Sequence, residues 1–394
     1  MASANTQSNT IKYYVAHIFS GASFIVPITI LYYLARGLSY FEIGLLESIF
    51  LCASFALEIP TGALADRIGR KYVISMGVLI VAIATVLIGL GNSFLIFALA
   101  QIIFGIGAAL RSGADTALIY DSLIENNQSN LYNKIEGKSY AFFSIAGVIA
   151  APFGAYLFSI NYKWPFFIDG LLLFFAALSY FLMHEPKNKP HKKSNDNYLT
   201  ILILGLKNSI QAPIIRWYII FTVFLSLMMG IFASLLSQPL LIAKGVNVVF
   251  IGYIFSIILF FQAVCSMYAH KIEAFLREKS ALFLIFFIPG ISFLLMSYPT
   301  LAITLFFFIF YYFSKGFQYP ILKDYIQRRI SSDTRATVLS IQNFFDSLAG
   351  IIFFPIFGLL IDRLPITNSL IFLGLITLSV GFILYVYRPK NNTI

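Results

Sequence analysis

Long apolar segments recur along the whole of this 394-residue chain. A helix needs about 20 apolar residues to cross the roughly 30 Å hydrocarbon core of a bilayer. Only 11% of the residues are charged, against about 25% in a soluble domain. Backbone groups in lipid must be bonded within their own segment, which favours helices. We therefore predict an all-α membrane protein with twelve transmembrane helices, at residues 12–35, 42–61, 73–91, 94–121, 138–158, 164–183, 217–242, 249–269, 280–297, 300–325, 336–361 and 368–387.

The positive net charge of +10 is interpreted as a topology signal. Lys and Arg gather in cytoplasmic loops of membrane proteins. If both termini are cytoplasmic, nearly all the basic loop residues fall on that side, and the far side keeps only Arg36, Lys163, Lys244 and Arg363. Nucleic-acid binding is the rival explanation, but these basic residues lie in short loops beside spans, where they face lipid head groups. We expect a bacterial inner-membrane protein with membrane lipid and no nucleic acid as partners.

Cofactor and metal sites are not predicted. The two cysteines, Cys52 and Cys265, lie in separate apolar spans, and the four histidines are scattered. Such a distribution offers no ligand cluster.

The longest polar break divides the chain into two halves. We predict an N-terminal six-helix bundle at 1–183, a cytoplasmic linker at 184–216 and a C-terminal six-helix bundle at 217–394. Within the linker, the short apolar run at 198–206 is a candidate for a helix lying on the membrane surface.

The halves carry an internal repeat. "SIAGVIAAP" at 144–152 matches "SLAGIIFFP" at 347–355, an offset of 203 residues that also pairs Asp121 with Asp324. Parallel repeats are a transporter architecture with the substrate site near the bilayer midplane, between the repeats. The pattern predicts two pseudo-symmetric halves that expose this site alternately to each side.

The loop after the second span is the densest charge cluster, "GALADRIGRK" at 62–71. An anchoring hairpin explains its basic residues but not Asp66. The loop closely resembles the signature loop of the major facilitator superfamily, and the twelve-span layout extends this resemblance over the chain. In that family the loop clamps the halves together on the cytoplasmic side. Its aspartate, here Asp66, lies near the N-terminus of span eleven, and its basic residues pair with an acid ending span four. The resemblance implies the major facilitator fold and a cytoplasmic latch that stabilises the outward-facing state, made of Gly62, Asp66, Arg67, Gly69, Arg70, Lys71 and Asp121.

Further motifs are similar to those of the drug/proton antiporter branch. "GVIAAPFGA" at 147–155 resembles the Gly- and Pro-rich motif of span five, with Ala151 at one expected glycine. Gln101 occupies the position where these antiporters carry an arginine in span four. Close packing of a Pro-kinked helix is the alternative explanation for the span-five motif.

Ionisable residues at membrane depth are the candidates for a substrate or proton site, because charge is costly there. Arg111 and Asp115 are four residues apart and can form a structural pair, and a salt bridge between Lys315 and Asp346 would satisfy both. Asp169 lies near a span end, where water can reach it. The candidates are Asp346, Lys315, Arg111, Asp115 and Glu47.

These features predict a monomeric secondary active transporter that moves a small amphipathic molecule. An aromatic content of 17% suits such ligands. Proton-coupled efflux is the preferred function, and proton-coupled uptake of a nutrient or metabolite by the same fold is the alternative. A polytopic membrane enzyme is the third possibility, but no H-E-x-x-H or similar catalytic cluster occurs in the sequence, so no enzymatic activity is predicted.

Overall fold

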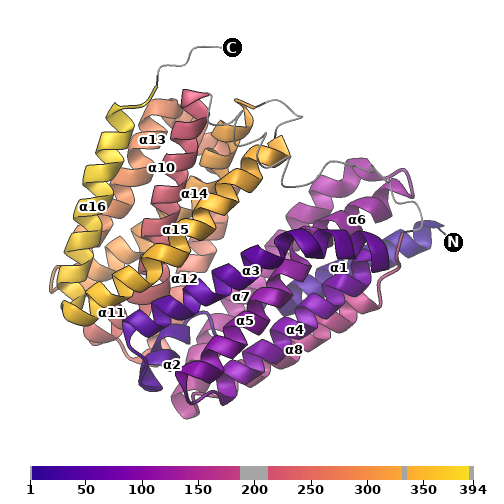
Figure 1. Ribbon diagram of the computed structural model, residues 1–394, viewed down its shortest axis with the longest axis horizontal. Coiled ribbons are helices and arrows are strands. Elements are labelled where there is room, and N and C mark those ends of the chain that lie inside the picture. The colour runs from indigo at the N-terminus through magenta and orange to yellow at the C-terminus, as the bar shows by residue number, and fades with distance from the viewer. Residues whose placement is uncertain (1, 187–211, 331–334, 390–394) are drawn as a thin grey trace. The chain divides into compact units, whose positions relative to one another are not determined.

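The structure is a computed structural model that describes residues 2–186, 212–330 and 335–389. Helices make up all the regular secondary structure of these residues (Figure 1). The surface helix predicted at 198–206 lies outside them. The helices are α1 (Ala2–Gly21), α2 (Thr29–Ala35), α3 (Tyr40–Ile68), α4 (Arg70–Leu90), α5 (Phe94–Arg111), α6 (Ala114–Ile124), η1 (Ser129–Leu131), α7 (Tyr132–Ile160), α8 (Trp164–Phe181), α10 (Pro213–Ile231), η2 (Phe232–Leu236), α11 (Ser237–Ala243), α12 (Val248–Met267), α13 (Ala269–Met296), α14 (Leu301–Gln327), α15 (Arg335–Arg363) and α16 (Ile366–Val386).

The chain forms two compact units. Described residues within Met1–Leu38, Leu45–Ser194 and Asn247–Ser256 form the first unit, and the others form the second. The predicted halves are continuous in sequence. In the structure, by contrast, the first residues of one helix from each half group with the other unit. The start of α3, Ser39–Gly44, groups with the second unit, and the start of α12 groups with the first.

Glycines make these two exchanges possible. A Cβ atom at Gly44 in α3 would overlap the backbone of Phe354 in α15, and one at Gly252 in α12 would overlap the backbone of Ala151 in α7. Small residues let membrane helices approach this closely.

Helix packing follows one order in both units. In the first unit, α4 packs against α5 and α8, and in the second, α13 packs against α14 and α16. The buried core of the first unit includes Ile74 and Leu118, and that of the second includes Phe221 and Phe286. The two units are thus built on the same helical plan, as the internal repeat predicts.

Eleven helical segments of the described residues are long and apolar enough to cross a membrane. The first predicted span, 12–35, is not among them, because α1 ends at Gly21 and α2 begins only at Thr29. The fourth predicted span is also interrupted. Gly113 adopts a left-handed conformation (φ 71°) between α5 and α6, which glycine reaches without steric cost.

Asp169 of α8 binds the break that follows α1. Its Oδ1 accepts the backbone N–H of Phe24 (2.7 Å), and its Oδ2 accepts the hydroxyl of Ser23 (3.0 Å). On the other side, Gly154 of α7 leaves room for the backbone of Phe24. Asp169 is only 4% exposed, so its expected position in reach of water was wrong. The carboxylate replaces a helical hydrogen bond that the interrupted backbone has lost.

We expect Asp169→Ala to lower the free energy of unfolding by about 1–3 kcal/mol, because the N–H of Phe24 loses its buried acceptor. Asp169→Asn keeps the Oδ1 acceptor and should cost less. Thermal unfolding of the purified protein in detergent measures both, with Ser179→Ala, whose hydroxyl makes only an exposed bond within α8, as the control. Equal unfolding temperatures for wild type and Asp169→Ala would show that the break does not depend on this carboxylate.

Candidate functional site

The start of α4 holds an ion pair and a helix cap. Gly69 has φ 105°, which turns the chain between α3 and α4. The guanidinium of Arg70 forms an ion pair with Asp121 of α6, which is buried. The carboxylate of Glu185 accepts the backbone N–H groups of Arg70 and Lys71, both at 2.9 Å. An acid at a helix N-terminus is favourable. This contact joins Glu185, which follows α8, to the first residues of α4.

The other residues of the predicted latch lie around this ion pair. Arg67 is exposed, and the Lys71 ammonium lies 4.7 Å from the ring centroid of Tyr72. The side chain of Asp66 and the surroundings of Gly62 are outside the described part of the structure. The structure therefore brings Arg70 together with Asp121, and the position of Asp66 relative to α15 stays a prediction.

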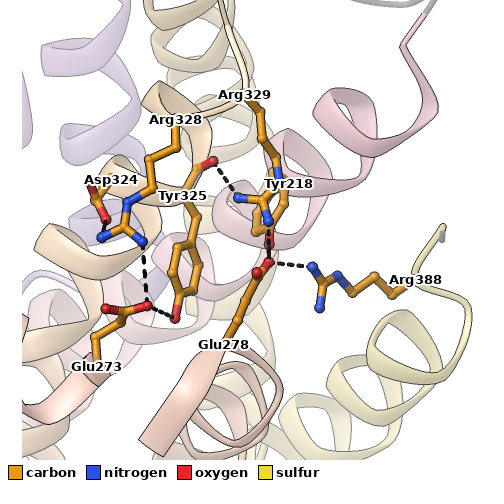
Figure 2. Close-up of polar contacts among 8 residues, drawn as sticks. All are labelled: Tyr218, Glu273, Glu278, Asp324, Tyr325, Arg328, Arg329 and Arg388. Carbon is orange, nitrogen blue, oxygen red and sulfur yellow. Dashed lines mark hydrogen bonds and ion pairs between the residues drawn. The ribbon is translucent and has the colours of Figure 1, made fainter. Parts of the chain in front are cut away.

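The second unit has a cluster at the equivalent place, centred on Glu278 of α13 (Figure 2). Its carboxylate binds the guanidinium of Arg329 (2.6 Å), the guanidinium of Arg388 and the hydroxyl of Tyr218. Arg329 follows α14 and Arg388 follows α16, so one acid joins three helices. We call these four residues the Glu278 cluster.

Beside it, Glu273 of α13 forms a second contact with α14 and the residue that follows it (Figure 2). It accepts the hydroxyl of Tyr325 (3.2 Å) and lies 3.6 Å from the guanidinium of Arg328. Arg328 also pairs with Asp324 at 2.6 Å. Asp324 is the repeat mate of Asp121, yet it lies outside the Glu278 cluster.

The two units place opposite charges at matching positions. The first has a cation at the start of α4 and acids in α6 and after α8, in Arg70, Asp121 and Glu185. The second has an acid in α13 and cations after α14 and α16. A residue with positive φ comes directly before both Arg70 and Glu278 (Gly69, φ 105°; Arg277, φ 59°). The two units thus share this arrangement, but the positions of the acidic and basic side chains are exchanged between them.

We expect Arg70→Glu and Asp121→Arg each to lower the unfolding temperature, because each reversal leaves two like charges in contact. The double reversal restores an opposite pair with the polarity of the Glu278 cluster, so it should recover most of the loss. Breaking a buried pair costs about 3–5 kcal/mol, and this pair is partly exposed, so the expected loss is smaller. Thermal unfolding of all four proteins tests this, and additive losses in the double variant would contradict it.

A polar cluster of the first unit surrounds the break at Gly113. Arg111 and Asp115 flank this break rather than sharing one continuous helix, and their charged atoms are 4.0 Å apart. Asp115 lies within electrostatic range of His17 and Glu136. The set of residues that meet here, from α1, α5, α6, α7 and α8, is Tyr13, His17, Arg111, Asp115, Glu136 and Tyr180, which we call the Asp115 cluster.

Hydrogen bonds connect this cluster. The hydroxyl of Tyr13 donates to Glu136 (2.8 Å), and Nδ1 of His17 lies 3.0 Å from the carbonyl oxygen of Tyr13 and 3.4 Å from the hydroxyl of Tyr180. Glu136 was missed in the sequence because it precedes the predicted span 138–158. In the structure α7 begins at Tyr132, which carries Glu136 into the helix bundle. These bonds link Tyr13, His17, Glu136 and Tyr180, and Asp115 lies within electrostatic range of His17 and Glu136.

Asp346 of α15 lies in a polar pocket of the second unit. The pocket has a volume of about 140 Å³ and is bounded by α10, α14 and α15, with Ser226, Lys323 and Asn343 also in its wall. Three polar atoms of its lining are buried without a hydrogen-bond partner: Thr222 Oγ1, Gln342 Oε1 and Asp346 Oδ1. Unsatisfied buried polar atoms are rare in proteins, so this pocket is suited to a polar ligand group, water or a proton.

The remaining sequence candidates lie elsewhere. Lys315 does not line this pocket, and its ammonium lies 5.7 Å from the ring centroid of Tyr312. Among the described contacts it forms no salt bridge with Asp346, so the alternative explanation that the two charges simply neutralise each other finds no support. Glu47 lies within electrostatic range of Tyr33, which accepts a hydrogen bond from Gln101 (3.3 Å).

An acid at the end of α15 binds the start of α3. Both oxygens of Asp362 accept backbone N–H groups, from Tyr40 (2.8 Å) and Phe41 (2.9 Å). A Cβ at Gly358 would overlap the backbone of Tyr40, so glycine permits the approach. Both α3 and α15 carry an Asp-Arg pair close to their last residue, at Asp66 and at Asp362.

Two helical units of the same plan, apolar enough to span a bilayer and each containing a cluster of ionisable side chains, define a membrane transporter. In the described residues no group of three or more His, Cys, Asp or Glu is placed to hold a metal ion. Residues 13–354 match the family model of the Major Facilitator Superfamily. The chain therefore belongs to this superfamily, as its loop motif indicates, and it is a transporter and not an enzyme.

Curated relatives and solved structures agree with this assignment. The chain is 24% identical over 234 residues to the quinolone resistance protein NorA of Staphylococcus aureus (strain MSSA476), which covers 59% of this chain and 58% of NorA. It is 28% identical over 196 residues to multidrug resistance protein 2 of Bacillus subtilis (strain 168), covering 49% of this chain and 48% of that protein. The chain thus matches about half to six-tenths of the length of these relatives.

Solved structures match over nearly the whole chain. The nucleoside transporter NupG gives a TM-score of 0.75 at 15% identity, covering 97% of this chain and 97% of NupG. A bacterial homologue of the human lysosomal transporter Spinster gives 0.74 at 17% identity, covering 98% and 96%. At these identities the similarity establishes the fold alone.

Proposed function

We propose that this protein exports small amphipathic molecules from the cytoplasm in exchange for protons. The Asp115 cluster carries this proposal, because it brings His17, Asp115 and Glu136 together inside the first unit. Ionisable residues within membrane bundles are expensive and mark ion or substrate pathways. The names of NorA and multidrug resistance protein 2 support export of drug-like molecules.

Protonation of the Asp115 cluster is the coupling step of this proposal. A proton that reaches Asp115 or Glu136 removes a negative charge that Arg111 and the Tyr13 hydroxyl now stabilise. This weakens the contacts among α1, α6 and α7 and favours a second arrangement of these helices. In the second arrangement the carboxyl group gives its proton to the cytoplasmic side. The carboxylate can then bind the next proton, so each cycle moves protons inwards.

The Asp346 pocket is proposed to bind a polar or cationic group of the substrate. Its unpaired oxygens, on Thr222, Gln342 and Asp346, offer acceptors to such a group. A substrate with a cationic head can bond to these acceptors, and the ring of Tyr319 in the pocket wall can also attract a cation. Binding of a proton to Asp346 would compete with such a substrate, which is the requirement for exchange.

Two carboxylates at helix ends are proposed to stabilise alternate states. Asp362 binds the start of α3, and Asp66 is expected to bind the start of α15 when the cytoplasmic latch closes. A carboxylate at a helix N-terminus contributes about 0.3–1 kcal/mol, which biases a balanced equilibrium without freezing it. Arg70 and Asp121 would hold the latch loop in position for this contact.

We expect Asp115→Asn and Glu136→Gln each to reduce pH-gradient-driven accumulation of ethidium in inside-out vesicles by at least about tenfold, the equivalent of about 1.4 kcal/mol, because each removes a carboxylate that takes up the coupling proton. Asp346→Asn should abolish the dependence of transport on the pH gradient, because the asparagine side chain stays neutral and cannot take up or release a proton. Asp324→Asn, an exposed acid-to-amide change, is the control.

Export predicts accumulation in inside-out vesicles and little in right-side-out vesicles, since the substrate site loads from the cytoplasmic side. The reverse preference would indicate uptake, the alternative function. Gradient dependence that survives all three acid-to-amide changes would exclude these carboxylates as coupling groups.

We expect Asp66→Ala to cut the transport rate several-fold while leaving membrane insertion intact, since a loss of about 0.3–1 kcal/mol at the latch shifts the balance between states. Lys138→Ala, at an exposed position outside the latch, serves as the control. Transport is measured in vesicles with equal amounts of protein. A normal rate for Asp66→Ala would refute the latch.

A further inference from the structure

An apolar groove runs along the second unit between α10, α15 and α16. Its volume is about 630 Å³. Side chains from one face of α10, among them Val223 and Leu227, line one wall, and Phe345, Ala349 and Phe353 of α15 line the other. Among the described lining residues only Arg216 is charged, and it lies at the start of α10.

The rim of the groove is open. Ile220 is 48% exposed, Phe345 36% and Phe353 40%. In a chain whose helices cross a bilayer, exposed apolar side chains between neighbouring spans face hydrocarbon.

The internal repeat shows how the matching helix of the first unit differs from α15. At the offset of 203 residues, Phe353 and Phe357 of α15 correspond to Ala150 and Gly154 of α7. The small residues of α7 are buried, because α1 and the break after it lie directly against this helix. The two phenylalanines instead line an open space beside α10. Bulky side chains keep helices apart where small residues let them meet.

The length of the groove fits one leaflet. On α10 it extends from Arg216 to Met228, twelve residues or about 18 Å along the helix axis. Half of the hydrocarbon core is about 15 Å thick. Arg216 is exposed at the predicted cytoplasmic end, so its guanidinium lies where a lipid phosphate would be.

We propose that this groove binds one anionic phospholipid of the inner leaflet, with an acyl chain along α10 and α15 and the phosphate on Arg216. The apolar walls take the chain and explain the absence of polar lining residues other than Arg216. The guanidinium can bind phosphate oxygens by two parallel hydrogen bonds. The lipid would fill the space that Phe353 and Phe357 leave open and would support α16 on α10. This site is separate from the Asp346 pocket and does not depend on the proposed transport activity.

Native mass spectrometry of the detergent-purified protein tests the site with phosphatidylglycerol and phosphatidylcholine of identical acyl chains. We expect the wild type to retain phosphatidylglycerol about five-fold more strongly, the equivalent of about 1 kcal/mol for one basic residue at the membrane surface. Arg216→Ala should bind both lipids equally. Arg363→Ala, at the other end of α15, removes the same charge outside the groove and should keep the preference.

A second variant tests the groove itself. Ala349→Phe places a ring in the middle of the space and should reduce retention of both lipids several-fold, without lowering the unfolding temperature measured in lipid-free detergent. Retained preference in Arg216→Ala, or wild-type retention in Ala349→Phe, would overturn the proposal. So would displacement of the lipid by ethidium in the wild type but not in Ala349→Phe, since the groove would then be a substrate site.

Discussion

The cost of an unpaired polar group in a hydrocarbon environment governs this structure. Charged or polar atoms at membrane depth are tolerated where other groups satisfy them. Asp169 satisfies the interrupted backbone after α1, and Asp121 and Glu278 are each paired with arginine. Nine buried side-chain atoms of the described residues lack a hydrogen-bond partner, and three of them gather in the pocket of Asp346. The fold thus separates acids that hold helices together from acids that are available to a ligand.

Much of the architecture could be predicted from the sequence, because the length of an apolar run is set by bilayer thickness and needs no tertiary information. The loop at 62–71 indicated the family because all the residues of its motif lie within a short stretch of chain. Such a motif, too, can be recognised without tertiary information. The break after Gly21 could not be predicted, because mostly apolar residues continue through it. At Gly113 the sequence does show polar neighbours, Arg111 and Asp115, but they do not reveal that one helix ends there and another begins. What decides them is a carboxylate far away in sequence in one case and a left-handed glycine in the other.

The candidate site was only partly visible for the same reason. Arg111, Asp115 and Asp346 were found because a charge inside an apolar run is conspicuous. Glu136 was hidden at the edge of a span. Glu185 and Glu278 were hidden in polar stretches, where an acid is ordinary and only the folded backbone shows what it binds. Residue type could be read from the sequence, whereas the partner depends on which helices meet. The internal repeat predicted the shared helix packing of the two units. It did not predict the reversed charges around Glu278 or the phenylalanines beside α10.

Substrate-induced proton release from the purified protein tests the central claim most directly, because it needs neither vesicles nor an imposed gradient. Ethidium is added to the protein in weakly buffered detergent solution near pH 7, and the change in pH is recorded. If acids inside the units exchange protons for substrate, the wild type releases protons on binding. A variant with both Asp115→Asn and Glu136→Gln, which leaves the proposed substrate pocket unchanged, should release fewer protons for each ethidium bound. Binding of ethidium by the wild type with no proton released would contradict the account.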